Sequence, residues 1–265
     1  KLAGGNPVIV KASFEQNFKM TPDQLEAAIT PKTRMLILCS PSNPTGSVYS
    51  KEELEQLANV IKRHEDVFVL ADEIYEHINY IGQHESIAQF PGMKERTILV
   101  NGVSKAYAMT GWRIGYIAAP EWIVKGCNKL QGQYTSGPCS VSQRAALAAY
   151  VTEQACVEEM RQAFQRRRDL IVRLAKEIDG FEVNEPQGAF YLFPKCSSYF
   201  GKSDGQHTIN SATDLAMYLL ETSHVATVGG DAFGDSECIR MSYATSDENI
   251  RQALKRMKEV LAKLK

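Results

Sequence analysis

The sequence lacks any long apolar run, since no stretch of its 265 residues approaches the roughly 20 apolar residues of a membrane-spanning helix. It also has little net charge: 30 Lys and Arg stand against 31 Asp and Glu, a formal charge of −1. This balance gives no electrostatic reason to expect nucleic acid or an anionic membrane as the main partner. We expect an ordinary globular protein.

Cysteine is sparse and scattered, and no Cys-x-x-Cys pair occurs. The spacing of the six cysteines argues against a zinc site and against a disulfide framework, and it suits the reducing cytoplasm. The five histidines show no ligand spacing either. We therefore predict no metal and a cytoplasmic location.

Internal repeats and low-complexity tracts are also absent, and what the chain does have is an alternation of element types. Apolar runs of strand length at Met35–Cys39, Val67–Ala71 and Thr97–Val100 alternate with amphipathic helical patterns such as Ser50–Arg63. Uninterrupted apolar strands alternating with such helices indicate an α/β fold, with a mostly parallel sheet and helices on both faces. A further strand is expected at Arg113–Ala119.

Helix-start signals support this interpretation. Thr21 followed by Pro22 is typical of an N-cap and first helical position, and Ser50 with Glu53 forms a capping-box pattern. Further helices are expected at residues 121–130, 141–152, 155–178, 212–222 and 247–264, and further strands at 8–10, 189–193, 225–228 and 238–242.

The predicted helices and strands become shorter past Gly180, which indicates a second, smaller α+β domain. We predict a large domain over residues 1–165 and a small one over 166–265. The arginines between Arg161 and Arg173 alternate with acidic residues, so we interpret them as a solvated helix face and not as a nucleic-acid patch.

Polar residues follow three of the predicted strands at the ends where ligands bind. In parallel α/β sheets ligands bind outside the carboxyl ends of the strands. Asn43, Asp72, Tyr75 and Lys105 all fall at that edge. We predict that they belong to one site.

One amine and one guanidinium follow the strand at Thr97–Val100. Lys105 comes first and Arg113 eight residues later. An amine can form a Schiff base with an aldehyde, and a guanidinium can clamp a phosphate through two parallel hydrogen bonds. A cofactor with both groups is pyridoxal 5′-phosphate (PLP). In a chain with 30 Lys and Arg, the alternative for this pair alone is surface charge.

Four motifs together resemble the signature of fold type I, class I and II PLP-dependent aminotransferases. They are Ser42-Asn43-Pro44-Thr45-Gly46, Asp72-Glu73-Ile74-Tyr75, Ser104-Lys105 with Arg113, and Ile239-Arg240-Met241-Ser242-Tyr243-Ala244. The run from Asn101 to Tyr116 is similar to the bacterial aspartate aminotransferase branch. The resemblance covers the whole chain in the right order.

This resemblance implies a role for each cofactor-binding residue. Asp72 would pair with the protonated ring nitrogen, and Asn43 and Tyr75 would donate to the phenolate oxygen. Arg113 would hold the phosphate, with Ser104 as a second contact. Where some relatives carry a phosphate-binding serine this chain has Gly102, so part of the phosphate cradle stays unassigned.

The resemblance also assigns the reacting groups. Lys105 would hold the cofactor aldehyde and later move the proton at the substrate Cα, so Lys105, Asp72 and Tyr75 form the catalytic set. Arg240 would grip the substrate carboxylate, with Asn43 beside it. Without the resemblance, Asn43 would be taken as a turn residue and Arg240 as a surface charge.

The function implied is transamination between an L-amino acid, aspartate or glutamate, and a 2-oxo acid. The alternatives are alanine, aromatic or glutamine-type substrates, or an inactive fragment or PLP-fold binding module. In the resembled family about a third of the polypeptide lies upstream of Lys1, so we expect a fragment whose full-length parent is a homodimer.

Overall fold

The computed structural model describes all residues from 1 to 265, and the chain divides into two compact units. Unit 1 comprises residues 1–19, 42–47 and 162–265, and unit 2 comprises residues 20–41 and 48–161. The predicted division into two domains after residue 165 stays a prediction. Along the chain, the last passage from unit 2 to unit 1 lies between residues 161 and 162. No helix is both long and apolar enough to cross a membrane.

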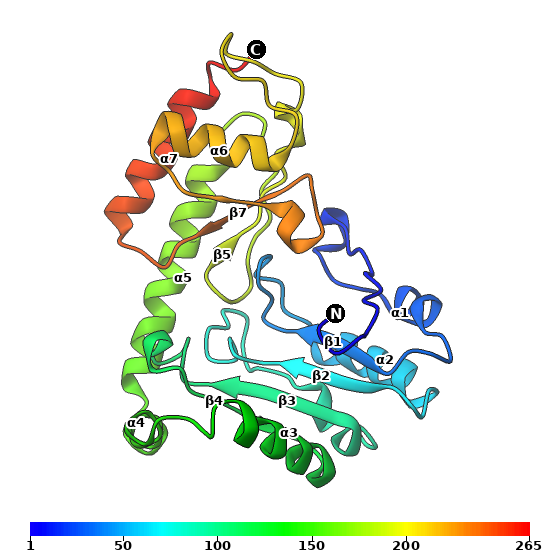
Figure 1. Ribbon diagram of the computed structural model, residues 1–265. Coiled ribbons are helices and arrows are strands. Elements are labelled where there is room, and N and C mark those ends of the chain that lie inside the picture. The colour runs from blue at the N-terminus through cyan, green and yellow to red at the C-terminus, as the bar shows by residue number, and fades with distance from the viewer. The chain divides into compact units, whose positions relative to one another are not determined.

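Unit 2 is built on a four-stranded sheet in the order β1-β2-β3-β4, and Figure 1 shows the strands side by side. The strands are β1 (Met35–Cys39), β2 (Phe68–Asp72), β3 (Thr97–Gly102) and β4 (Gly115–Ala118). The first three are parallel and β4 pairs antiparallel with β3. The predicted mostly parallel α/β sheet is confirmed, with β4 shorter than the predicted strand.

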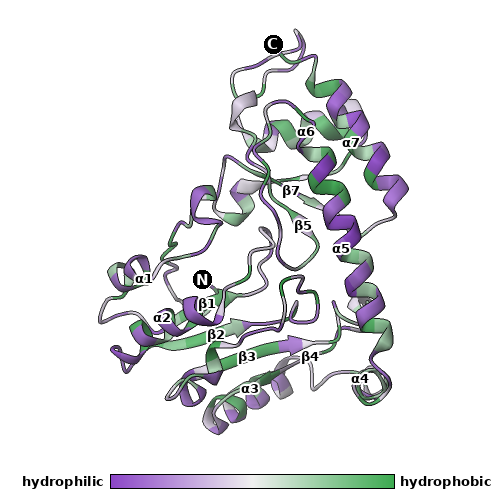
Figure 2. Cartoon of the chain, turned by 180° about the vertical axis from the view of Figure 1, so that it is seen from behind, coloured by the Kyte–Doolittle hydropathy of each residue, from purple (hydrophilic) through white to green (hydrophobic).

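The core of unit 2 lies between this sheet and α2 (Lys51–Lys62). Leu54, Leu57 and Ile61 of α2 form one buried cluster with Val69 and other strand residues. Such a cluster requires an apolar stripe on the helix and apolar strands beneath it. In Figure 2 the colouring of β2 and β3 is mostly hydrophobic.

Both predicted helix-start patterns of unit 2 are capping boxes. Thr21 accepts from the backbone N–H of Gln24 before α1 (Pro22–Ala28), and Ser50 accepts from that of Glu53 before α2. In each box the third residue's side chain accepts from the cap residue's N–H in return. These local hydrogen bonds satisfy donors that every helix start leaves open.

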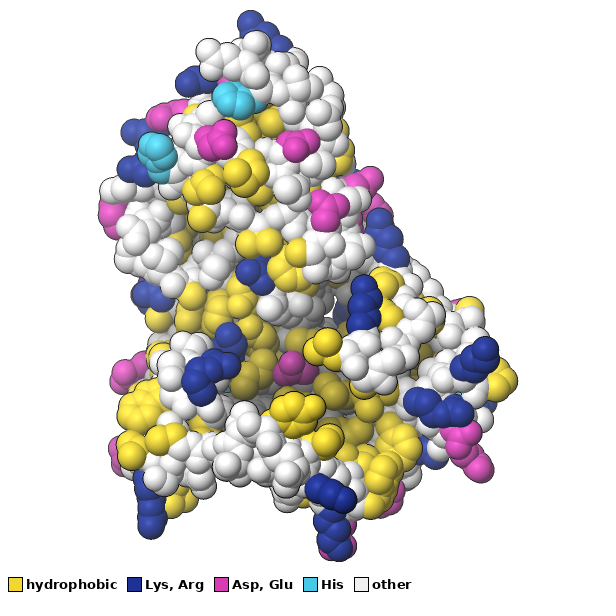
Figure 3. Space-filling view, in the orientation of Figure 1, with side chains coloured by type: hydrophobic (Ala, Val, Ile, Leu, Met, Phe, Trp, Pro, Cys, Tyr) yellow, Lys and Arg dark blue, Asp and Glu magenta, His cyan; other side chains and the backbone are white.

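The remaining helices of unit 2, α3 (Glu121–Tyr134) and α4 (Ser140–Val151), leave much apolar surface uncovered. No residue of α3 is buried, and Trp122 is 65% and Tyr134 84% exposed. On β1, Ile37 is 71% exposed. Figure 3 shows hydrophobic side chains gathered over the region of this sheet.

Unit 1 packs helices against a small antiparallel sheet in the order β5-β7-β6. Its strands are β5 (Tyr191–Leu192), β6 (Val228–Gly229) and β7 (Ile239–Ser242), and its helices are α6 (Ala212–Ser223), α7 (Asp247–Leu261) and the later part of α5 (Ala155–Ala175). Short 3-10 helices lie at Phe14–Gln16, Ile87–Gln89, Lys94–Arg96, Thr110–Trp112, Ser197–Tyr199 and Gly230–Phe233 across the two units.

Two expectations fail for physical reasons. No strand forms at residues 8–10, where Val8 is 67% and Ile9 75% exposed and no neighbouring strand pairs with them. The arginine-rich helix face is not wholly solvated, because Arg168 is buried and donates to the Pro186 carbonyl at 2.6 Å. A buried guanidinium needs such acceptors.

Candidate active site

The parallel register of unit 2 aligns the carboxyl ends of its strands. Cys39 of β1 lies opposite Asp72 of β2, and Asp72 lies opposite Val100 of β3. Asp72 is the last residue of its strand, and Lys105 follows β3 by three residues. Both residues therefore fall at the sheet edge where ligands of parallel α/β proteins bind.

A tight turn from Asp72 to Tyr75 carries two of the predicted residues. The Asp72 carboxylate accepts from the backbone N–H of Ile74 at 3.2 Å, which fixes the start of the turn. Tyr75 is only 3% exposed, and the Lys105 amine lies 5.6 Å from the centre of its ring. The structure thus brings Lys105 to Tyr75, one turn away from Asp72.

The strand that leads to Lys105 ends at Gly102, where there is no room for a side chain. A Cβ at Gly102 would lie 2.9 Å from both the Gly115 Cα and the Ile114 carbonyl oxygen. In this chain the crowding favours glycine at position 102, and that part of the phosphate cradle stays unassigned.

Arg113 ends the loop in a left-handed conformation. Its φ is 53°, its side chain is exposed, and Nη1 donates to the Thr110 carbonyl at 2.9 Å. Ser104, beside Lys105, is half-buried. The four groups Asp72, Tyr75, Lys105 and Arg113 belong to unit 2, as does Ser104.

The other two predicted residues, Asn43 and Arg240, meet in unit 1. Arg240 on β7 donates from Nη1 to the Asn43 side-chain oxygen at 2.9 Å. The rings of Tyr191 and Phe233 each lie 4.7 Å from its guanidinium carbon. Its Nε is buried and has no hydrogen-bond partner. A buried, unpaired cationic donor is costly, so this nitrogen suits the oxygen of an anionic ligand.

The segment that carries Asn43 is hydrogen-bonded to a later segment of unit 1. The carbonyl of Gly46 accepts from the backbone N–H groups of Gln187 and Gly188 at 2.8 and 2.9 Å. Gly46 has a φ of +70°, and a Cβ there would lie 2.9 Å from the Gly188 carbonyl oxygen. These contacts therefore fix the backbone of the Asn-Pro-Thr-Gly turn to which Asn43 belongs.

Sequence reasoning missed one cluster beside the Asp72 turn. Glu73, Glu76 and His84 each bring a potential metal-ligand atom within 4.8 Å of the others. Glu73 accepts from His84 Nε2 at 2.9 Å and from Ser86 Oγ at 2.6 Å. No local spacing pattern signals this cluster, because a loop brings His84 back to the strand end.

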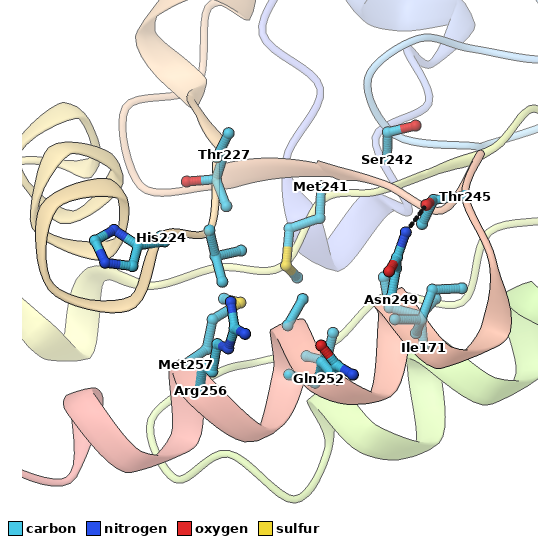
Figure 4. A pocket seen from close by; sticks show the side chains of 15 residues that line it. Ile171, His224, Thr227, Met241, Ser242, Thr245, Asn249, Gln252, Arg256 and Met257 are labelled. Carbon is cyan, nitrogen blue, oxygen red and sulfur yellow. Dashed lines mark hydrogen bonds between the residues drawn. The ribbon is translucent and has the colours of Figure 1, made fainter.

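One cavity of unit 1 is not part of this arrangement. It has a volume of about 300 Å³ and lies between β7, α7 and the segment after α6. Figure 4 shows Met241, Asn249 and Arg256 among its lining, with Asn249 hydrogen-bonded to Thr245 at 2.9 Å. None of the predicted site residues lines it, so this cavity does not mark the predicted chemistry.

Comparison with known proteins gives a family match over nearly the whole chain. Residues 1–257 match the family described as aminotransferase class I and II. A Petunia hybrida protein named bifunctional aspartate aminotransferase and glutamate/aspartate-prephenate aminotransferase is 50% identical over 270 residues, covering 100% of this chain and 56% of the relative. An aspartate/prephenate aminotransferase of Cereibacter sphaeroides is 47% identical, covering 99% of this chain and 66% of the relative.

Solved structures agree with the sequence relatives. The crystal structure of the aspartate aminotransferase from Rhizobium meliloti superposes with a TM-score of 0.94 at 45% identity, covering 98% of this chain and 66% of that one. The chain therefore spans between about half and two thirds of the length of the relatives it matches.

Proposed function

Because the chain belongs to the class I and II aminotransferases, we propose that it serves PLP-dependent transfer of an amino group between aspartate or glutamate and a 2-oxo acid, as part of a protein of the relatives' length. The observation that carries this proposal is the Lys105 amine beside the buried Tyr75 ring, one turn from Asp72. The family uses PLP as its cofactor.

The donor set of the chain fits this cofactor. PLP presents an aldehyde, a ring nitrogen, a phenolate oxygen and a phosphate, and the chain offers a matching group for each. When bound, the protonated ring withdraws electrons from the substrate Cα. Lys105 suits the aldehyde and the Asp72 carboxylate suits the ring N–H. Tyr75 suits the phenolate oxygen, a role that the resemblance also implies for Asn43, and Arg113 with Ser104 suits the phosphate.

Two residues then act on the substrate. The Lys105 amine would move a proton between the substrate Cα and the carbon of the cofactor's aldehyde group, as general base and then general acid. Arg240 binds the substrate α-carboxylate, and its buried, unpartnered Nε supports this role. Its hydrogen bond to Asn43 holds the guanidinium in orientation.

A second candidate substrate comes from the relatives' names. Two relatives at 50% and 47% identity are named for prephenate as well as aspartate. Transfer from glutamate or aspartate to prephenate would use the same Lys105, Asp72 and Arg240. The two candidates separate in one assay, with 2-oxoglutarate or prephenate as acceptor for the amino group of aspartate.

We also propose that the complete protein is a cytoplasmic homodimer. All six cysteines are free thiols, which suits a reducing compartment. The exposed Trp122, Leu130 and Tyr134 of α3 and the exposed Val141 and Leu147 of α4 give unit 2 an apolar surface that a second subunit could cover.

The test of the cofactor role is covalent capture. After PLP is added and the mixture is reduced with borohydride, peptide mapping should find the cofactor on Lys105. Lys105→Ala should lose this labelling and all transamination, whereas Lys129→Ala on the exposed α3 should retain both. Labelling scattered over other lysines, with Lys105 unmodified, would contradict the proposal.

A further inference from the structure

Glu73 is a buried carboxylate at the centre of the turn that carries Asp72 and Tyr75. It is only 5% exposed. An ionised carboxylate can only accept, so the Ser86 hydroxyl at 2.6 Å and His84 Nε2 at 2.9 Å are its donors. Each of its two oxygens thus has one side-chain partner, as a buried charge requires.

The main chain of Glu73 is fixed as well. Its N–H donates to the Val100 carbonyl of β3 at 2.9 Å, and its carbonyl accepts from the Glu76 N–H at 2.9 Å. The Ile78 N–H donates to the Tyr75 carbonyl at 2.8 Å. Side-chain and main-chain bonds therefore meet at Glu73, directly after Asp72 and two positions before Tyr75.

A metal ion is the other possible use of this cluster, since Glu73, Glu76 and His84 lie within 4.8 Å. The hydrogen bonds argue against it. His84 Nε2 donates to Glu73 and so carries a proton, which excludes that nitrogen as a ligand in this arrangement, and the buried Nδ1 has no partner. A ligand set would need Nε2 without its proton and aimed at the ion.

We propose that Glu73 is a positioning residue, which with His84 and Ser86 holds the Asp72–Tyr75 turn in the conformation that binds the cofactor. The inference rests on the proposed function. Glu73 touches neither cofactor nor substrate in this role. It acts by fixing the backbone from which the Asp72 carboxylate and the Tyr75 hydroxyl project, beside Lys105.

The test is Glu73→Gln, which keeps the size of the side chain. It replaces one acceptor oxygen with an NH₂ group, which would face the donor of His84 or of Ser86. We expect PLP affinity to fall about tenfold or more, and the pH midpoint of the bound cofactor's absorbance change to shift. In the PLP-free protein, amide hydrogen exchange across residues 72–76 should speed up. Glu85→Gln is the matched control, since the Glu85 carboxylate accepts from the Gln89 side chain at the surface.

A second, milder variant keeps the inference testable if Glu73→Gln does not fold. Ser86→Ala removes one donor and keeps the charge, so it should give the same three changes to a smaller extent. A lower unfolding temperature with PLP affinity, absorbance midpoint and exchange all unchanged would mean a purely structural role and overturn the inference. If EDTA caused the same three changes in the parent protein, the cluster would be a metal site, and the inference would be overturned.

These readouts separate the inference from the proposed function. A parent protein that does not bind PLP defeats the proposed function, and the exchange measurement on PLP-free protein still decides whether Glu73 fixes the turn. A parent that binds PLP, with a Glu73→Gln variant that matches it in all three readouts, defeats the inference alone.

Discussion

Asp72 joins the end of a strand to the start of a turn, and its carboxylate has one local partner, the Ile74 N–H. The sequence placed it correctly, because a continuous apolar strand that ends in Asp needs only local pattern reading. The role as partner of the cofactor's ring nitrogen stays a proposal.

Asp72→Asn keeps the shape of the side chain and removes its charge. The ring nitrogen then loses the anion that stabilises its protonated form, so transamination should fall by a factor on the order of 100 or more. Asp72→Glu should be milder, and Asp66→Asn, at an exposed position of the same unit, should have no effect. Steady-state kinetics of the PLP-bound protein measure this, and equal rates for Asp72→Asn and the parent would leave the carboxylate a structural role only.

Contacts between residues far apart in the chain lay beyond sequence reasoning. Asn43 and Arg240 are 197 positions apart and hydrogen-bond at 2.9 Å. Only the family resemblance singled out both, and no spacing rule predicts their contact or the Tyr191 and Phe233 rings beside the guanidinium. The Glu73 cluster had no resemblance to point to it, so it went unseen.

At the scale of elements, strong local signals predicted well and weak ones did not. The capping boxes at Thr21 and Ser50 depend on residues three apart, and both formed. The apolar run at Val8–Val10 formed no strand, because a strand needs a hydrogen-bonded neighbour that the sequence alone does not identify. The antiparallel direction of β4 likewise depends on the loop that precedes it.

Tyr49 ties the starts of α1 and α2 together and gives a pH-dependent prediction. Its hydroxyl oxygen accepts from the Met20 N–H at 2.7 Å, and burial raises the pKa of Tyr49 to about 12. A raised folded-state pKa gives stability that is fully present below the unfolded pKa of about 10 and is lost as the pH rises from there to about 12. By pH 11 this loss should be about 1 kcal/mol of unfolding free energy.

Tyr49→Phe is the variant that isolates this effect. It should be less stable than the parent at pH 8 by about 1 kcal/mol, because the Met20 N–H loses its acceptor. Between pH 9 and pH 11 it should lose less stability than the parent does. Urea unfolding at each pH measures both, with Tyr134→Phe at an 84% exposed position as the control. Parallel pH curves for Tyr49→Phe and the parent would contradict the assignment.

At the scale of the whole molecule, the proposed roles divide between the two compact units. Asp72, Tyr75, Lys105 and Arg113 belong to unit 2, and Asn43 and Arg240 belong to unit 1. The sequence predicted an α/β protein with a smaller second part. It did not predict that residues 42–47 group with the C-terminal residues, because that grouping depends on bonds such as those from Gln187 and Gly188 to Gly46.

Among these residues only Arg240 is proposed to bind the substrate without touching the cofactor, so its substitution should affect substrate binding and not cofactor binding. Arg240→Lys keeps the charge but loses the planar fork that binds a carboxylate through two hydrogen bonds. The dissociation constant for 2-oxoglutarate or aspartate should rise about tenfold to a hundredfold, while that for PLP should change less than about twofold. Absorbance titrations of the same preparation with PLP, and then with substrate, measure the two constants. Arg251→Lys on the exposed side of α7 is the control and should change neither. If Arg240→Lys weakened PLP binding as much as substrate binding, Arg240 would serve the cofactor, and its proposed role as a substrate-only residue would be wrong.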